Sequence, residues 1–166
     1  GISGASVANV MDGAGMTVGG FYAHFPSKQA LVQETLRETI AKSRMTLMAA
    51  AEGKKGKEWI KAIAKSYLSR QHRDNPNVGC PLPAVLGETA RENLPGREAL
   101  ALEIESTADE IASRLEAEGR SDPNGEALAL LSTMIGGLTL SRALPDAKLS
   151  DAVLLACRRQ IEKSLA

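Results

Sequence analysis

Apolar residues recur along this chain at intervals of three and four positions, and no stretch alternates apolar and polar residues in the way of a half-buried strand. This spacing predicts helices that each turn one apolar side toward a shared core. Glycines and prolines fall mostly between these stretches, where they end helices. We therefore expect an all-α protein.

The first residues form a unit of their own. Two short helices are expected, from Ser6 to Met11 and from Thr17 through Phe25, with the turn Gly13-Ala14-Gly15 between them. Small residues suit a turn at which two helices meet steeply. The pattern predicts a helix-turn-helix domain over residues 1–30 and a larger helical domain over residues 31–166.

The larger domain is expected to hold six helices, and the proline-rich segment 78–83 and the break Leu94-Pro95-Gly96 should separate some of them. The predicted helices are a long one capped by Ser27 that ends near Glu52, then 56–72, 84–93, 97–118 and 123–144, and a last one capped by Ser150.

The helix 123–144 is apolar around much of its circumference, more than one small core can cover. Its pair Gly136-Gly137 permits close approach by another helix. We therefore expect a homodimer through the helices 123–144 and 150–165, arranged about a two-fold axis.

Composition excludes several classes of protein. The 166 residues carry 20 basic and 20 acidic side chains and 43% apolar residues, which is typical of a globular domain. No apolar run is long enough to span a bilayer and no signal peptide is visible, so we expect no membrane partner and a cytoplasmic location. Two distant cysteines exclude a disulfide framework, and two distant histidines make a metal site improbable. We expect no cofactor.

Polar groups follow the glycine turn at helical spacing. Thr17, Tyr22, His24 and Lys28 can donate hydrogen bonds to phosphates, which position a protein on DNA. The adjoining face of the helix, Val18, Gly19 and Ala23, is poor in hydrogen-bonding groups, and Gly20 follows Gly19 in the chain. Each glycine in a helix costs about 1 kcal/mol relative to alanine, so two of them indicate close approach by another surface.

The run Gly-Phe-Tyr-x-His-Phe-x-x-Lys-x-x-Leu, here residues 20–31, resembles the DNA-binding helix-turn-helix of the TetR family of bacterial transcriptional regulators. The resemblance implies phosphate contacts from the donors named above and a recognition helix that carries Val18, Gly19 and Gly20. Ala5 stands where the family often has Ser or Thr, so Ser6 is expected to take over that cap. The family's first helix would precede Gly1. We therefore expect an incomplete small domain in which Val10 and Phe21 lack cover.

The same resemblance implies a small-molecule cavity within residues 55–145. Trp59, Ile63 and Tyr67 share one helix face, and Met134 can face them from a later helix; Ile104 is left unassigned. Plain core packing is the alternative for each residue. Cys80 is interpreted as a buried apolar group, with a redox sensor as the alternative.

The function predicted from these features is a TetR-type regulator. It would bind palindromic operator DNA as a homodimeric repressor and leave it on binding a small apolar or aromatic effector. The alternative is a helical small-molecule-binding or interaction protein without specific DNA activity. An enzyme has no support, because no catalytic motif is visible and no catalytic residue is assigned.

Overall fold

The computed structural model describes residues 2, 4–77, 79–92 and 97–166, and within these residues the chain forms nine helices and no strand. The all-α prediction is confirmed. The helices are α1 (Val7–Gly13), α2 (Val18–His24), α3 (Lys28–Ala49), α4 (Gly56–Tyr67), α5 (Arg70–Asp74), α6 (Leu82–Glu92), α7 (Arg97–Ala117), α8 (Pro123–Ala143) and α9 (Ala147–Ser164).

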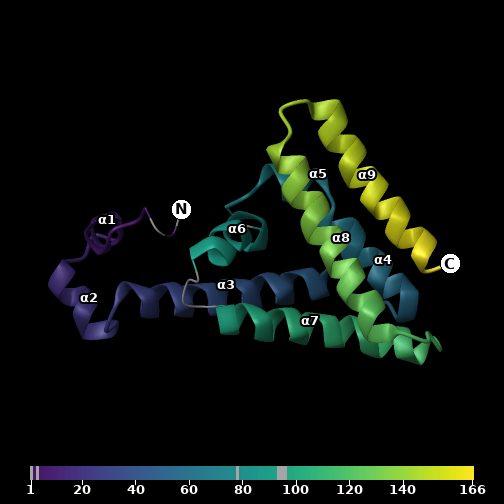
Figure 1. The fold of residues 1–166 in the computed structure, drawn as a ribbon, viewed down its shortest axis with the longest axis horizontal. Coiled ribbons are helices and arrows are strands. Elements are labelled where there is room, and N and C mark those ends of the chain that lie inside the picture. The colour runs from purple at the N-terminus through teal and green to yellow at the C-terminus, as the bar shows by residue number, and fades with distance from the viewer. Residues whose placement is uncertain (1, 3, 78, 93–96) are drawn as a thin grey trace.

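α1 and α2 lie at one end of α3, and the bundle that contains α4, α8 and α9 lies at its other end (Figure 1). α1 and α2 pack chiefly against each other beyond the first turn of α3. At its other end α3 runs beside α7, while α8 crosses the bundle and packs against both α7 and α9. None of the described helices is long and apolar enough to cross a membrane.

Hydroxyl side chains begin the first three helices, as their positions predict. The Ser6 hydroxyl accepts the N–H of Asn9 at 3.1 Å, Thr17 accepts that of Gly20 at 3.1 Å, and Ser27 accepts that of Ala30 at 3.2 Å. Each bond satisfies a donor that the first helical turn leaves unpaired.

The turn between α1 and α2 depends on one glycine. Gly15 has φ of +68°, a left-handed conformation that other residues adopt only with strain. The Gly15 N–H donates a hydrogen bond to the Asp12 carbonyl, and the Met16 N–H donates one to the Met11 carbonyl at 2.9 Å. This pair of bonds is the Schellman motif that ends many helices. Gly13 is the last residue of α1 and does not have a positive φ.

The prediction of a single helix over residues 56–72 is wrong. α4 ends at Tyr67, and Ser69 then caps the separate short helix α5 by accepting the N–H of His72 at 3.1 Å. A serine inside an apolar periodic stretch competes for backbone hydrogen bonds, and here it starts a new helix.

Two further helix starts differ from the prediction. α9 begins at Ala147, because Asp146 rather than Ser150 caps it. Ser150 is buried inside α9, and its hydroxyl donates to the Ser141 carbonyl on α8 at 2.6 Å. α6 starts at Leu82, so Pro83 lies in its first turn, where its missing N–H costs nothing. The predicted break Leu94-Pro95-Gly96 lies outside the described residues.

The main core lies where α4, α7, α8 and α9 meet. Its fully buried large side chains come from all four helices and from the residue after α4: Ile60, Ile63, Leu68, Ile111, Leu115, Met134, Leu138, Leu154 and Ile161. The core thus supports the far end of α3, and α2 is carried at the near end.

Candidate DNA-binding surface and core cavity

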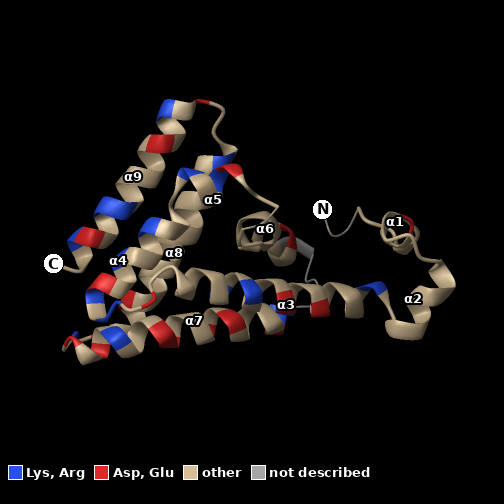
Figure 2. Ribbon diagram, turned by 180° about the vertical axis from the view of Figure 1, so that it is seen from behind, with Lys and Arg blue, Asp and Glu red and all other residues tan. Residues whose placement is uncertain are grey.

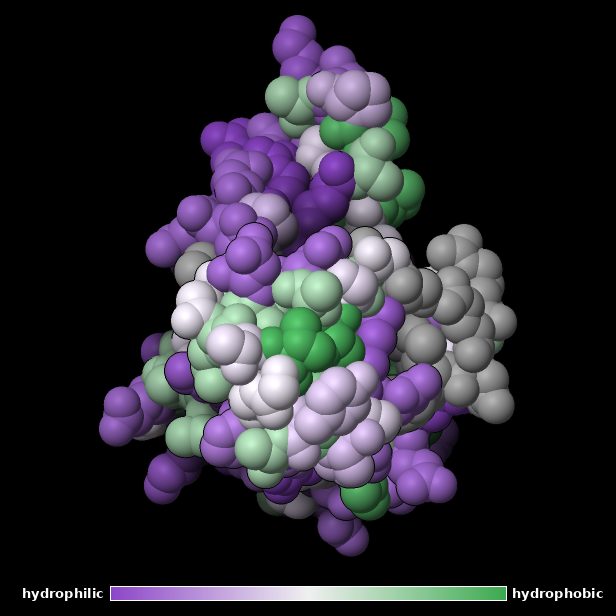
Figure 3. Space-filling view, turned by 90° about the vertical axis from the view of Figure 1, so that its left-hand side faces the viewer, coloured by the Kyte–Doolittle hydropathy of each residue, from purple (hydrophilic) through white to green (hydrophobic). Residues whose placement is uncertain are grey.

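α2 presents its predicted contact residues to solvent. The side chains of Tyr22 and Val18 are 62% and 44% exposed, and Gly19 and His24 are also exposed. Figure 3 views the molecule from the end where α1 and α2 lie, and apolar residues gather there on the surface. A free aromatic and a free aliphatic side chain on one short helix form a surface suited to contact with another macromolecule.

The hydroxyl groups at the helix starts keep a free donor. Ser6 and Thr17 use an oxygen lone pair for capping, so each O–H can still donate to an outside acceptor such as a phosphate oxygen. Lys28 is the first residue of α3 and is partly buried. The predicted phosphate donors therefore lie at the ends of α1, α2 and α3.

Phe21 holds α2 in place. Its side chain is only 1% exposed, its ring meets the Tyr22 ring edge-on with centroids 5.1 Å apart, and it lies 5.7 Å from the Phe25 ring. The expectation that Phe21 lacks cover is therefore wrong, whereas Val10 is 39% exposed. Phe21 anchors the inner side of α2 and leaves Tyr22 on the outer side.

The surface of α1 and α2 is almost uncharged. Residues 1–27 contain no Lys or Arg and one acid, Asp12. Figure 2 shows both helices nearly free of charged residues, with the first basic residue at the start of α3. Phosphate contacts from this unit would therefore come mainly from hydroxyls and backbone N–H groups, which contribute less to salt dependence than cations do.

The two glycines of α2 have open space around them. A Cβ added at Gly19 would meet only the Thr17 hydroxyl oxygen, at 3.9 Å. A Cβ at Gly20 would meet the same atom at 3.5 Å. Both are ordinary contacts, so packing within this chain does not require glycine at either position.

A cavity of about 350 Å³ opens beside α3, α4 and α5; we call it the outer cavity. Its lining is largely polar and uncharged, with Tyr67 and Cys80 at its buried side. The residues that line it are Ser43, Thr46, Leu47, Ser66, Tyr67, Ser69, Gln71, His72, Asn75, Gly79 and Cys80.

A second space of about 40 Å³, the inner cavity, lies deeper between α3, α7 and α8. Four residues line both spaces: Ser43, Leu47, Tyr67 and Cys80. The remaining lining of the inner cavity is apolar apart from Arg44, Glu103 and Thr107, and it consists otherwise of Ile40, Leu82, Ile104, Leu131, Met134 and Ile135. The shared residues make the two spaces neighbours.

Arg44 on α3 faces Glu103 on α7 across the inner cavity. Arg44 Nε lies 3.4 Å from Glu103 Oε2, close enough for an ion pair. Neither atom has a hydrogen-bond partner among the described residues, although both are buried. The pair thus balances its charge and leaves hydrogen-bonding capacity unused at the cavity wall.

Tyr67 brings a second unused polar group. Its side chain is 5% exposed, and within the described part of the chain its hydroxyl has no hydrogen-bond partner. Burial raises the pKa of this phenol well above its ordinary value, and the neighbouring Cys80 thiol raises it further. The group therefore stays a neutral O–H at physiological pH.

The sequence-predicted ligand residues separate in the structure. Tyr67 and Met134 line the inner cavity, but Trp59 and Ile63 line neither space. Trp59 is buried under the Arg114 guanidinium, whose carbon lies 3.8 Å from the ring centroid. Ile63 is fully buried in the core. The last turn of α4, which carries Tyr67, faces α3, whereas Trp59 and Ile63 on the earlier turns are buried away from both cavities.

Sequence reasoning missed most of the cavity wall. Ile104, to which the sequence assigns no role, lines the inner cavity, as do Ile40, Arg44 and Glu103 from the two long helices. A buried Arg and Glu on separate helices give no local pattern that would mark them as partners. Only the packing of α3 on α7 brings them together.

His72 connects the outer cavity to the segment before α6. Its Nε2 accepts the Cys80 N–H at 3.0 Å, and its Nδ1 lies 2.8 Å from the Tyr67 carbonyl oxygen. A ring that accepts at Nε2 and faces a carbonyl with Nδ1 carries its single proton on Nδ1. Burial lowers the pKa of His72, which favours this neutral form.

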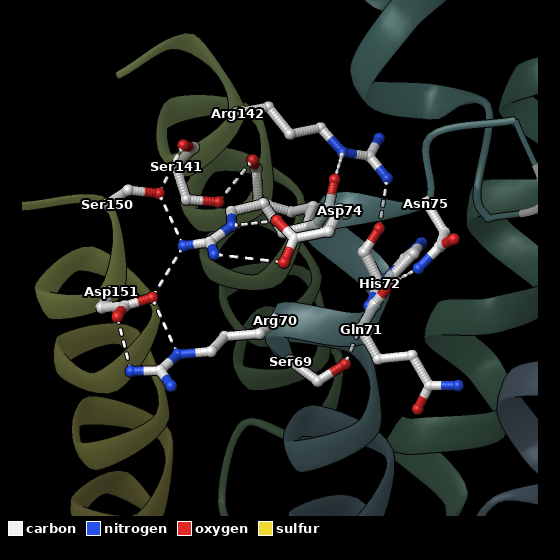
Figure 4. A network of polar contacts seen from close by, with 12 residues as sticks. Ser69, Arg70, Gln71, His72, Asp74, Asn75, Ser141, Arg142, Ser150 and Asp151 are labelled. Carbon is white, nitrogen blue, oxygen red and sulfur yellow. Dashed lines mark hydrogen bonds and ion pairs between the residues drawn. The ribbon is translucent and has the colours of Figure 1, made fainter. Parts of the chain in front are cut away.

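A polar network joins α5 to α8 and α9 (Figure 4). Asp151 on α9 accepts from Arg73 Nη1 at 2.7 Å and from Arg70 Nη2 at 2.5 Å. Hydrogen bonds from Arg70 and then Arg73 hold the pKa of Asp151 below its ordinary value. Arg142 on α8 donates to the His72 carbonyl at 2.7 Å. α5, at the edge of the outer cavity, is thus bonded to α8 through its backbone and to α9 through its side chains.

One side of α8 lacks cover. Leu128 and Leu140 are about half exposed, and Gly136 lies between them on the exposed side with open space around it. Gly137, in contrast, is buried within the chain, where an added Cβ would lie 2.7 Å from Cys157 Sγ. Of the two glycines assigned to a helix interface, only Gly136 faces outward.

Within the described residues, no three His, Cys, Asp or Glu side chains are grouped in a way that could hold a metal ion.

Three solved structures have the same fold. A TetR transcriptional regulator from Chloroflexus aurantiacus is 24% identical with a TM-score of 0.81, covering 98% of this chain and 86% of its own. The reduced form of NemR from Escherichia coli is 17% identical with a TM-score of 0.78, covering 98% and 87%. A TetR-family regulator from Cytophaga hutchinsonii is 18% identical with a TM-score of 0.77, covering 98% and 86%.

A comparison with curated protein sequences gives no match. Residues 1–35 match the family model described as bacterial regulatory proteins, tetR family. This match covers α1, α2 and the start of α3, the region that carries the motif found in the sequence. The resemblance is therefore confirmed: residues 1–35 match the tetR family model, and the whole chain has a fold similar to that of solved TetR-family transcriptional regulators.

Proposed function

We propose that this protein is a homodimeric TetR-type repressor that binds palindromic operator DNA and leaves it when a small molecule enters the core cavity. Ser6, Thr17, Tyr22, His24 and Lys28 contact phosphates, and Val18, Gly19 and Gly20 lie against the groove. The small domain of residues 1–30 carries these contacts, and residues 31–166 bind the effector and the second protomer.

The observation that carries this proposal is the position of α3. One end of α3 follows α2 directly, and its other end lines both cavities through Ser43 and Leu47. A molecule that separates α3 from α7 therefore shifts the helix that carries α2. The ligand and the DNA would then favour different positions of one rigid element, which is the requirement for coupling between two sites.

The second protomer covers the exposed side of α8. Half-exposed leucines on either side of an open glycine favour a close helix contact, and the two-fold operation pairs this surface with itself. The neighbouring C-terminal helix α9 also carries an exposed leucine, Leu155. A dimer of this kind would present two α2 helices to half-sites about one DNA turn apart, ~34 Å.

The test is a binding selection from random DNA with the natural full-length protein. The proposal predicts enrichment of an inverted repeat. Tyr22→Ala and Lys28→Ala should each weaken binding to selected and random DNA alike, by roughly fivefold to tenfold, because phosphate contacts carry no sequence information. Leu102→Ala, at an exposed position of α7, is the control and should leave the affinity for DNA unchanged.

Two results would contradict the proposal. A pool without an enriched sequence would favour the other class, a helical small-molecule-binding or interaction protein without specific DNA activity. A Tyr22→Ala variant that loses discrimination while its affinity for random DNA stays the same would remove the phosphate role of Tyr22.

A further inference from the structure

We propose that the effector is an electrically neutral molecule with an apolar body and one oxygen that accepts a hydrogen bond from the Tyr67 hydroxyl, as a ketone or ester carbonyl does. The inference deepens the proposed function and rests on it for the effector's regulatory role. It follows from the unused polar groups of the inner cavity, from its balance of charge and from its size.

The Tyr67 hydroxyl lies beside the Cys80 thiol, a weak hydrogen-bonding group, and it has no stronger partner among the described residues. A buried polar group that is poorly hydrogen-bonded is destabilising, so a better partner would be favoured. The residue lines both cavities, so an entering molecule can place an oxygen against it. A phenol hydroxyl is a better hydrogen-bond donor than acceptor, because its oxygen lone pair is delocalised into the ring, so the ligand atom that matches it best is an acceptor.

The charges around the cavity exclude an ionic effector. Arg44 and Glu103 are the charged side chains that line the inner cavity, and they neutralise each other. The residues that line the outer cavity include no Asp, Glu, Lys or Arg, and His72 is neutral. An anion bound at Arg44 would place a second negative charge beside Glu103, and the single guanidinium cannot balance both in this partly buried site.

The size of the inner cavity adds a consequence for regulation. About 40 Å³ is far below the ~300–1,000 Å³ of typical ligand pockets. An apolar body can enter between Ile104 and Met134 if α3 moves away from α7 and α8, or if these side chains change rotamer. By the first route, binding of the apolar part acts on the helix that carries α2.

Three probes of similar size separate the contributions: acetophenone, ethylbenzene and benzoate. They carry a neutral acceptor oxygen, no oxygen and an anionic group, respectively. Isothermal titration calorimetry on the full chain should give acetophenone an affinity at least about tenfold above that of ethylbenzene, which corresponds to one hydrogen bond to a buried donor. Benzoate should show no measurable binding.

Two variants assign these differences to residues. Tyr67→Phe keeps the ring and removes the hydroxyl, so acetophenone should fall to the affinity of ethylbenzene while thermal stability is maintained or increased. Tyr22→Phe removes the hydroxyl of the exposed tyrosine and is the matched control, expected to bind all probes as the natural protein does. Glu103→Gln leaves Arg44 without its counter-charge, so benzoate should gain binding.

Several outcomes would overturn the inference. They are equal affinity of the natural protein for acetophenone and ethylbenzene, no binding of acetophenone at millimolar concentration, and an unchanged preference in Tyr67→Phe. None of these outcomes bears on DNA binding, which the selection experiment measures separately. A protein that selects an inverted repeat but fails these titrations would keep the proposed function and lose the assigned effector class.

Discussion

The helix-turn-helix unit and the helical core build their functional surfaces in opposite ways. In α1 and α2 the important contacts join residues close in sequence, such as Thr17 with Gly20 and Met16 with Met11, and the candidate DNA contacts face solvent. In the core, Arg44 meets Glu103 from a separate helix, and the residues of the inner cavity are buried or half-buried. A short sequence motif therefore specifies the first surface, whereas the second exists only after the helices pack.

The two regions also differ in how their charges are used. The described part of α1 and α2 contains no cation, so that unit offers hydroxyls and N–H groups. In the core, Arg70, Arg73 and Arg142 are bonded to Asp151 and to backbone carbonyls near the outer cavity. These basic side chains therefore link helices of the larger region to one another through hydrogen bonds.

The largest expected effect separates the two neighbouring glycines of α8. Gly137→Trp should cost more than about 3 kcal/mol of unfolding free energy or prevent folding, because Cys157 and Leu68 already occupy the space beside it. Gly136→Trp should keep the helical circular dichroism and give a monomer in light scattering, since it faces outward. A dimer that survives Gly136→Trp would place the interface elsewhere.

The next effect compares one apolar side chain from each region. Ile63→Ala removes a fully buried side chain from the core and should cost about 2–5 kcal/mol in chemical denaturation. Val18→Ala removes an exposed side chain from α2 and should change stability by less than about 0.5 kcal/mol. Equal losses would show that α2 is packed against the rest of the protein.

A smaller effect concerns the open space on α2. Gly19→Ala should stabilise the helix by up to about 1 kcal/mol and yet weaken DNA binding, because the added methyl group occupies the surface that faces the groove. Gly87→Ala on α6 also meets open space and is the matched control. It should give a similar gain in stability with unchanged DNA affinity. If Gly19→Ala binds DNA as tightly as the natural protein does, α2 does not need a glycine at this position to approach the DNA groove.

The smallest effect is the pH dependence of the core. Burial lowers the pKa of His72 in the folded chain, so the unfolded chain binds the proton more tightly. Stability is therefore fully present above the unfolded value of about 6.5 and declines as the pH falls below it. Protonation also removes the acceptor of the Cys80 N–H.

Denaturation curves between about pH 5.5 and 7.5 measure this decline, in a range where carboxylates contribute little. His72→Gln should flatten the dependence. His24→Gln removes the exposed histidine of α2 and should leave the dependence in place. A decline that persists in His72→Gln would assign the effect to another group.

The linear pattern of residues is sufficient to predict the all-α class, the caps at Thr17 and Ser27, and the motif of residues 20–31, which lies within the match to the tetR family model. These features depend on neighbours within a few positions, so a linear pattern contains them. The sequence also allowed a helix through 56–72 and a cap at Ser150. Ser69 instead caps a separate helix, Asp146 caps α9, and Ser150 is buried against α8.

Which residues form the cavity depends on how the helices pack against one another. Tyr67 and Trp59 share an apolar stripe, yet one faces α3 with an unpaired hydroxyl and the other lies under Arg114. Likewise, Gly136 and Gly137 are adjacent but face solvent and core, respectively. Helical periodicity defines a face about a hundred degrees wide, and the positions of neighbouring helices decide which part of that face is filled, open or hollow.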